Sequence, residues 1–409
     1  MRPLRVMFIE ASSGGVVGGS LTGLYHLIRG LDRSAFACSM VLYEPKTIEA
    51  DLAALGVPVY HVSRRRVPKQ HALLGVQSYQ RAKRVGVIAR GLRCGRQAVR
   101  LAVEEGPAAL GLRRVIRRER PDVLHLGNGL RANFDAVLAA RLTGTPVVCH
   151  IKGFEKYSTR ERFAAAKIDA LVCMTQAVQA HCAANGVVAR RNEVVYDALD
   201  EDGFCPARSP AQVRAELPGL APQTPCAGIV GNIQEWKGQA VVVEAMALVH
   251  RRVPQARCLI VGGAHRAGAA YELELRRRVR EAGLENVVHF TGFRADIADV
   301  INALDVVVHA SVRPEPFGRV ILEGMLLRKP VVAAAAGGVP ELIADGDTGF
   351  LVPPGDAAAL AERLITLLGD PELRQRIGSR AQAWARERFS LAHHVASMTG
   401  IYHEVTRTH

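Results

Sequence analysis

Short apolar runs recur along the whole chain, separated by polar turns and by segments with helical spacing. The runs are four to seven residues long, which is typical of strands and too short for most helices. Between them, apolar residues recur three and four positions apart, as in 21–31 and 358–368. This alternation predicts buried parallel strands connected by helices. The predicted strands are 4–9, 38–43, 57–62, 121–126, 146–151, 169–175, 193–196, 226–231, 305–310 and 331–334.

The stretch 312–342 organises the second half of the chain. It follows a buried strand, begins with a polar turn that ends at Pro316, and continues into a helix that Lys329 and Pro330 terminate. The predicted buried side of this helix carries Val320, Ile321, Gly324 and Met325. In an open α/β sheet, ligands bind where the carboxyl end of a strand meets the amino end of a helix. Free backbone N–H groups and the helix dipole make that position an anion site.

Two carboxylates, Glu315 and Glu323, mark this position, with seven residues between them. If the segment is helical, their Cα atoms lie about 12 Å apart along the axis. The carboxyl pairs of glycosidases lie roughly 5–9.5 Å apart, so this pair is poorly spaced for acid/base catalysis. The spacing suits two carboxylates that bind different hydroxyls of one long ligand. The alternative is that the two residues have no binding role, with Glu315 exposed in a loop and Glu323 solvated on a helix.

The sequence EPFGRVILEGM, which starts at Glu315, resembles the E-x7-E signature of retaining glycosyltransferases of the GT-B fold, in particular family 4. The sequences GGVPE at 337–341 and DGDTGFLV at 345–352 are similar to that family's continuation. The resemblance extends over essentially the whole chain. It implies two Rossmann-like domains facing across a cleft, a nucleotide-sugar donor, and transfer of the sugar to an acceptor hydroxyl.

The resemblance also implies roles for individual residues. Glu323 is expected to accept hydrogen bonds from the ribose, and Glu315 to hold sugar hydroxyls. Lys237 is expected to stabilise the departing diphosphate, and His150 to close over the donor sugar. The family usually carries Arg where this chain has Asn232, so one expected phosphate charge is missing. The other expected donor-binding residues are Gly18, Gly19, Gly262, Gly263, Phe293, Arg294, Phe317, Gly318 and Arg319.

Histidines end two predicted strands of the first half, His125 in 121–126 and His150 in 146–151. A single histidine at a strand end is more often structural than catalytic. Two of them at the carboxyl edge of one parallel sheet favour a functional role. The glycine-rich turn 10–19 lies at the same edge and could be a dinucleotide-binding loop. It lacks G-x-G-x-x-G in order, however, so a tight turn is the alternative interpretation.

Composition is that of a globular protein, with 49% hydrophobic and 22% charged residues among 409, enough for two domains. We expect an N-terminal acceptor-side domain at 1–205, a nucleotide-sugar-binding domain at 206–385, and a C-terminal helix at 386–409 that crosses back. The eight cysteines form no C-x-x-C pair, which favours a reduced cytosol. The sequence D-x-D at 200–202 is a metal-binding motif in other glycosyltransferases, but here we interpret it as a loop. We expect no metal requirement.

Positive charge is concentrated in 64–120, which carries sixteen Lys and Arg and three acids and so has a net charge of +13 out of +14. Apolar residues interleave with these charges, as in cationic amphipathic helices. Attraction to anionic lipid head groups is the functional interpretation, and a solvated arginine-rich face is the structural one. Nucleic acid is disfavoured, because Tyr79 is the only aromatic residue among the charges.

Together with these observations, the resemblance implies a metal-independent, retaining glycosyltransferase acting on a glycan or lipid-linked acceptor in the synthesis of cell-surface polysaccharide or glycolipid. No run of the sequence is apolar enough for a membrane helix, and the first residues lack the apolar segment of a signal peptide. We therefore expect a cytoplasmic enzyme, peripheral at the inner face of the cytoplasmic membrane. A sugar-nucleotide epimerase that shares the fold remains an alternative, as does, less well supported, a basic nucleic-acid-binding protein.

Overall fold

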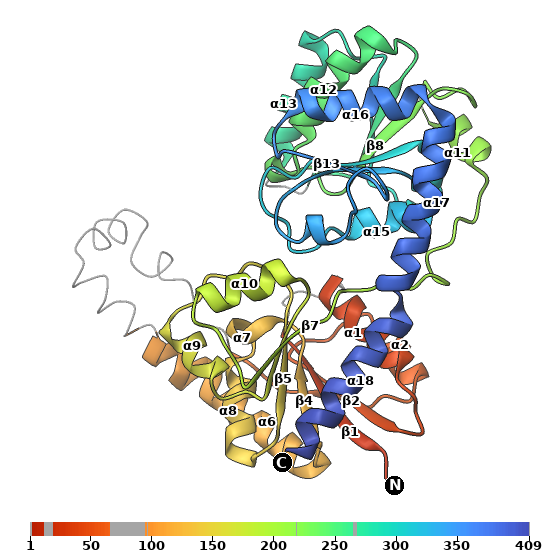
Figure 1. Cartoon of the computed structure of the whole chain (residues 1–409). Coiled ribbons are helices and arrows are strands. Elements are labelled where there is room, and N and C mark those ends of the chain that lie inside the picture. Colours follow the sequence, from red (N-terminus) through yellow and green to blue (C-terminus); the bar gives the residue numbers. More distant parts are fainter. Residues whose placement is uncertain are drawn as a thin grey trace. The chain divides into compact units, whose positions relative to one another are not determined.

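The computed structural model describes residues 2–11, 19–65, 95, 97–217, 219–264 and 268–408. The chain forms two compact units (Figure 1). Unit 1 comprises residues 1–173, 179–195 and 395–409, and unit 2 comprises residues 174–178 and 196–394. Each unit is built around its own parallel sheet.

Unit 1 contains a seven-stranded parallel sheet in the order β3-β2-β1-β4-β5-β6-β7. The chain builds the sheet outward from β1 in one direction, then returns to the other side of β1 with β4. The carboxyl ends of β1 and β4 therefore form the point at which the strand order reverses, where open α/β sheets bind ligands. The strands are β1 (Leu4–Glu10), β2 (Phe36–Leu42), β3 (Val59–His61), β4 (Val123–Leu126), β5 (Val147–Ile151), β6 (Ala170–Cys173) and β7 (Arg191–Val194).

Alternating side chains of the unit 1 strands enter the layers on the two faces of the sheet. Val6 and Phe8 join a core with helix α1 and with Tyr402 of the last helix. The helices α6 and α8 pack against each other and belong to the other layer (Figure 1). The helices that contribute are α1 (Gly19–Gly30), α2 (Glu49–Ala54), α6 (Gly106–Glu119), α7 (Gly129–Ala132), α8 (Phe134–Thr143), α9 (Thr159–Ala165), α10 (Gln176–Ala184) and α18 (Leu391–Arg407), with the π-helical turn η1 (Leu101–Glu105) before α6.

Unit 2 contains a six-stranded parallel sheet in the order β10-β9-β8-β11-β12-β13. The order reverses between β8 and β11, as it does between β1 and β4 in unit 1. The loops that follow β8 and β11 are therefore neighbours at the carboxyl edge of the sheet. The strands are β8 (Cys226–Val230), β9 (Arg257–Val261), β10 (Val288–Gly292), β11 (Val306–His309), β12 (Val331–Ala334) and β13 (Phe350–Val352).

Helices cover both faces of the unit 2 sheet, with α12 and α16 on one face and α15 on the other (Figure 1). Because helices cover both faces of the sheet, the central strands are mostly apolar, as in VVVH and VVAA of β11 and β12. The helices are α11 (Pro210–Glu216), α12 (Gln239–Arg252), α13 (Ala269–Glu281), α14 (Ile297–Ala303), α15 (Arg319–Leu326), α16 (Ala357–Gly369) and α17 (Pro371–Arg388), with the short turns η2 (Glu235–Lys237) and η4 (Val339–Glu341).

The α/β class and the two parallel sheets predicted from the sequence are confirmed. Each of the ten predicted strand ranges contains an observed strand or overlaps one. No helix among the described residues is long and apolar enough to span a membrane. The region 66–94, which holds much of the predicted basic amphipathic segment, lies outside the described residues, and so does Gly18.

Candidate functional site

The Glu315 carboxylate is the centre of a polar cluster at the strand-order reversal of unit 2. His309 is the last residue of β11, and its Nε2 lies 2.6 Å from Glu315 Oε2. The Ser311 hydroxyl donates to the same oxygen at 2.7 Å. Lys237, from the loop after β8, donates from Nζ to Oε1 at 2.7 Å. Both carboxylate oxygens are thus held by side chains from the two adjacent loops.

Burial alone raises the pKa of Glu315, but the hydrogen bonds and electrostatic interactions with His309 and Lys237 outweigh it and lower the pKa to about 2. The carboxylate is therefore ionised at any physiological pH. An ionised carboxylate can only accept hydrogen bonds. In this state Glu315 suits the binding of hydroxyl donors rather than proton donation.

The loop that carries Glu315 is fixed by a second loop, at Gly337 and Gly338. Glu315 and Gly337 form an isolated parallel bridge, and the Gly338 N–H donates to the Glu315 carbonyl at 2.9 Å. Gly337 has a φ of +69°, and a Cβ there would lie 2.2 Å from the Glu315 carbonyl oxygen. Only glycine fits this position, because any side chain would push the Glu315 backbone away.

Replacing Gly337 with alanine should lower the free energy of unfolding by about 2–5 kcal/mol, from backbone strain and overpacking. Displacement of Glu315 by even 1 Å should also reduce kcat about 10²-fold. Gly355→Ala is the matched control, because Gly355 has a φ of +79° and nothing within 4 Å of its Cβ position. The control should show backbone strain alone. Chemical denaturation and steady-state kinetics measure both effects, and equal losses in the two variants would contradict the close packing argued here.

Lys237 lies at the end of the turn η2, directly before α12. Gly238 separates them with a φ of +74°, and a Cβ there would meet the Ala310 carbonyl oxygen at 1.9 Å. This close approach brings the β8 loop against the end of β11. The Lys237 ammonium also lies 4.2 Å from the centroid of the Trp236 ring. A cation is thus held beside the amino end of α12, a combination that attracts anions.

Glu323 lies on α15, one turn after Arg319, and its side chain is 17% exposed. Burial raises the pKa of Glu323, while the charges of Arg319 and Lys237 oppose that shift. The helix begins at Arg319 after Gly318, whose φ is +99°. Glu315 is therefore outside the helix, so the 12 Å axial spacing calculated for a continuous helix does not describe the pair.

The glycine loops of unit 2 meet at the same edge of its sheet. A Cβ at Gly262, whose φ is +137°, would lie 2.1 Å from the Gly231 carbonyl oxygen and 3.5 Å from the Asn232 nitrogen. The next glycine, Gly263, accepts a hydrogen bond from Ile233 N–H at 3.1 Å. The backbones of the loops after β8 and β9 are therefore in direct contact, with no space for a side chain at Gly262.

Three further residues predicted to bind the donor lie on these loops or beside them. Phe293 is 80% exposed, whereas Phe317 is buried with its ring centroid 6.2 Å from that of Phe389. The Nε of Arg294 donates a hydrogen bond to Asp296 Oδ1 at 2.8 Å. The predicted donor-binding residues of unit 2 thus converge on one edge of the sheet, but Phe317 supports the loop from inside.

In unit 1, the two histidines lie next to each other at the carboxyl edge, as the strand positions predicted. The ring centroids of His125 and His150 are 5.8 Å apart, and His125 Nδ1 lies 2.6 Å from the Tyr402 hydroxyl. Glu10, at the end of β1, accepts a hydrogen bond from the Asn128 amide that follows β4. Gly19 is the first residue of α1. The roles assigned to His150 and Gly19 stay predictions.

Sequence reasoning missed His309 and Ser311, the residues that hold Glu315. The signal was present, because His309 ends a predicted strand as His125 and His150 do. Among the described residues, no group of three or more His, Cys, Asp or Glu is arranged to hold a metal ion. In the D-x-D sequence, the Glu201 carboxylate accepts a hydrogen bond from Arg386 at 3.0 Å, which fits the predicted loop.

Comparison with known proteins finds glycosyltransferase family models that match both halves of the chain. The family model "Glycosyl transferases group 1" matches residues 218–384, and "Glycosyl transferase 4-like domain" matches residues 18–198. The alpha-D-kanosaminyltransferase of Streptomyces kanamyceticus is 32% identical over 317 residues, which are 72% of this chain and 80% of that protein.

Two further proteins extend the comparison. The D-inositol 3-phosphate glycosyltransferase of Corynebacterium glutamicum (strain R) is 34% identical over 220 residues, so the chain matches about half (52%) of that relative's length. The crystal structure of Anabaena HepE in complex with UDP has a TM-score of 0.79 and 26% identity, and the match covers 98% of this chain and 100% of HepE. A second HepE structure, in complex with UDP-glucose, has a TM-score of 0.74.

Proposed function

The chain belongs to the group 1 glycosyltransferases, and on that premise we propose that it is a retaining, metal-independent enzyme that moves a sugar from a nucleotide-sugar to a hydroxyl of a glycan or lipid-linked acceptor. The two-domain GT-B fold and the transferase class follow from the family. The observation that carries the rest is the contact between Lys237 and Glu315, which places a cation and an ionised carboxylate side by side at the strand-order reversal of unit 2.

In this proposal the donor lies along the carboxyl edge of the unit 2 sheet. Glu323 accepts hydrogen bonds from the ribose hydroxyls, and Glu315 accepts them from the sugar hydroxyls. Lys237 and the amino end of α12 face the diphosphate, and the backbone N–H groups of Phe317, Gly318 and Arg319 add donors for sugar and phosphate. A UDP-sugar is the first donor to test, because HepE, with 26% identity, has been solved with UDP-glucose.

The chemistry assigned to these residues is stabilisation of the leaving group. As the bond between the anomeric carbon and the diphosphate breaks, negative charge grows on the diphosphate. A preorganised ammonium at that position stabilises the transition state more than the ground state. The acceptor hydroxyl attacks the face from which the diphosphate leaves, and a phosphate oxygen takes its proton. The side chains then need only bind, orient and exclude water.

Transfer should proceed with retention of the anomeric configuration and should be unaffected by excess EDTA. The reason is that Lys237 and the helix amino ends supply the positive charge that a divalent ion supplies in other glycosyltransferases. The product's anomeric proton coupling, measured by NMR, reports the configuration, and the initial rate with and without EDTA reports the metal requirement. Loss of all activity in EDTA that Mg²⁺ or Mn²⁺ restores would rule out the metal-independent mechanism.

The first experiment is to incubate purified protein with a panel of nucleotide-sugars and identify by mass spectrometry which one it retains. Release of free nucleoside diphosphate only in the presence of an acceptor supports transfer. The acceptor side of the proposal is a lipid-linked glycan presented at the cytoplasmic face of a membrane, in the synthesis of a cell-surface polysaccharide or glycolipid. Its basis is the positive charge of 64–120 in the N-terminal part of the chain.

A further inference from the structure

Exposed apolar side chains gather on one surface of unit 1, which we call the α6–α8 surface and which comprises residues 97–120 and 138–145. Among the described residues, ten large hydrophobic side chains are exposed, and five of these lie here. Each of the five is between 43% and 52% exposed. Contiguous exposed apolar side chains of this kind mark an interaction site, whereas isolated ones need no explanation. The five are Val99, Leu101, Val103, Leu110 and Leu142.

Three of the five, Leu101, Leu110 and Leu142, border an apolar groove of about 570 Å³ between the start of α6 and the outer side of α8. Leu101 of η1 and Leu110 of α6 line it on one side, and Leu138 and Leu142 of α8 on the other. The one charged residue among its lining residues is Arg141. The groove is therefore a hydrophobic surface with a cationic residue at its border.

Helix α6 changes from apolar to basic along a single face. Leu110, Arg114 and Arg117 are spaced by four and three residues, so they lie on one stripe of the helix. All three are exposed. Within the part of the chain that the structure describes, no carboxylate lies within 4 Å of the guanidinium of Arg114, Arg117 or Arg120. Arg118 differs, because its Nε donates to Glu119 at 2.7 Å.

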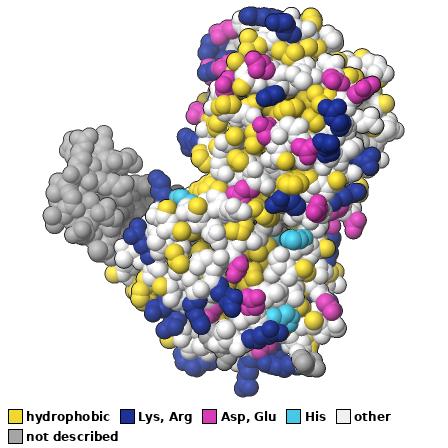
Figure 2. Space-filling view, viewed as in Figure 1, with side chains coloured by type: hydrophobic (Ala, Val, Ile, Leu, Met, Phe, Trp, Pro, Cys, Tyr) yellow, Lys and Arg dark blue, Asp and Glu magenta, His cyan; other side chains and the backbone are white. Residues whose placement is uncertain are grey.

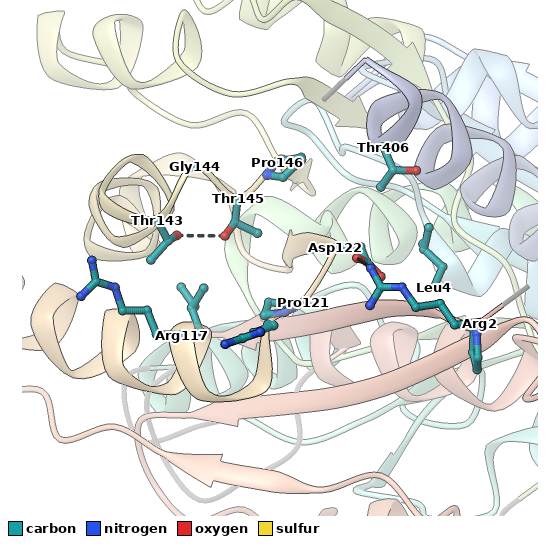
Figure 3. A pocket seen from close by; sticks show the side chains of 13 residues that line it. Arg2, Leu4, Arg117, Pro121, Asp122, Thr143, Gly144, Thr145, Pro146 and Thr406 are labelled. Carbon is teal, nitrogen blue, oxygen red and sulfur yellow. Dashed lines mark hydrogen bonds and ion pairs between the residues drawn. The ribbon is translucent and has the colours of Figure 1, made fainter.

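A second, cationic pocket of about 720 Å³ lies at the basic end of this stripe. Three arginines line it, Arg2, Arg117 and Arg120, against a single acid, Asp122, which is already bound to Arg2 at 2.7 Å. Figure 3 shows Arg117 and Arg2 at the two ends of the pocket with Asp122 between them. The pocket is therefore open to an anion with phosphate-like chemistry.

The helices α6 and α8 contribute lining residues to both pockets. Leu110 and Leu142 border the apolar groove, whereas Ile116 and Thr143, further along the same two helices, border the cationic pocket. Where Figure 1 labels α6 and α8, the space-filling view of unit 1 shows hydrophobic and Lys or Arg side chains next to one another (Figure 2). The surface thus carries an apolar groove and a cationic pocket on the same two helices.

We infer that the α6–α8 surface docks unit 1 on a bilayer of anionic phospholipids, with the leucines of the groove in the acyl boundary and the arginines of the pocket on the phosphates. This inference rests on the membrane-bound acceptor proposed above and names the surface of unit 1 that contacts the membrane. Apolar side chains beside unpaired arginines match the two layers of such a bilayer. A nucleic acid matches the arginines only, since the groove offers no aromatic ring for stacking.

The test is co-sedimentation of the full chain with vesicles of phosphatidylglycerol and phosphatidylcholine. The triple variant Arg114→Glu/Arg117→Glu/Arg120→Glu should partition about 100-fold less, since each near-surface arginine contributes appreciably to binding of anionic lipid. Its matched control is Arg251→Glu/Arg252→Glu/Arg280→Glu, three exposed arginines of unit 2 with no described ion pair, which makes the same change in net charge. The control should bind as the wild-type chain does.

The double variant Leu110→Asp/Leu142→Asp tests the groove, with the 69%-exposed Leu273 of α13 supplying the control Leu273→Asp. We expect at least about 10-fold weaker partition for the double variant, and transfer to a water-soluble acceptor unchanged in all variants. If the wild-type chain binds the vesicles and both test variants bind equally well, the α6–α8 assignment is wrong while the membrane proposal stands. If the wild-type chain stays in the supernatant at low salt, both fail.

Discussion

Replacing Lys237 with alanine should lower kcat by about 10²–10³-fold, which is the loss typical when one preorganised donor to a developing negative charge is removed. The ammonium is 2.7 Å from Glu315 and 4.2 Å from the Trp236 ring centroid, so it is held in place before any substrate arrives. Because the diphosphate gains charge only as the sugar leaves, the effect should appear mainly in kcat. KM for the donor should change much less.

Arg280→Ala is the control for loss of one positive charge from the same unit, because Arg280 is exposed on α13 and has no described ion pair. That control should keep wild-type kcat. The double variant Lys237→Ala/Glu315→Ala should lose less than the product of the two single losses, since the two side chains form an ion pair. A Lys237→Ala variant with raised KM and unchanged kcat would show that Lys237 binds the ground state and the transition state equally.

The sequence predicts the part of the site that depends on strand ends. Short apolar runs identify the strands, and glycine or proline residues mark where strands and helices end. All strands of a parallel sheet have their carboxyl ends at the same edge. Lys237 and Glu315 follow different strands, β8 and β11, and the strand order places those two ends side by side. Their 2.7 Å contact was not predicted as such, although both residues were assigned to one ligand.

The rest of the site depends on contacts whose geometry no local pattern encodes. The bridge between Glu315 and Gly337 joins loops that a helix and a strand separate, and only the packed sheet fixes their register. His309 could be recognised as a strand-end histidine, but its 2.6 Å contact with Glu315 follows from the turn 311–316 folding back on β11. The helix start at Arg319 depends on Gly318 adopting a φ of +99°, which glycine permits without requiring.

Glu323→Ala should raise the dissociation constant for the free nucleoside diphosphate about 10–100-fold, whereas Glu315→Ala should leave it unchanged or lower it. A hydrogen bond to a charged carboxylate contributes about 1.5–3 kcal/mol, and the ribose is present in the nucleoside diphosphate. The sugar that Glu315 is proposed to hold is absent from that ligand. Removing Glu315 also releases Lys237 from its ion pair, which leaves the ammonium available to the diphosphate.

Isothermal titration calorimetry with the free nucleoside diphosphate separates the two roles, and steady-state kinetics with the complete donor completes the comparison. Glu315→Ala should reduce kcat about 10²-fold, because a hydroxyl contact that aligns the sugar is lost. Glu285→Ala is the control, since Glu285 is an exposed acid of unit 2 with no described ion pair. Wild-type affinity in the Glu323 variant would remove the ribose role, and lost affinity in the Glu315 variant would mean that the carboxylate organises the diphosphate site instead of the sugar.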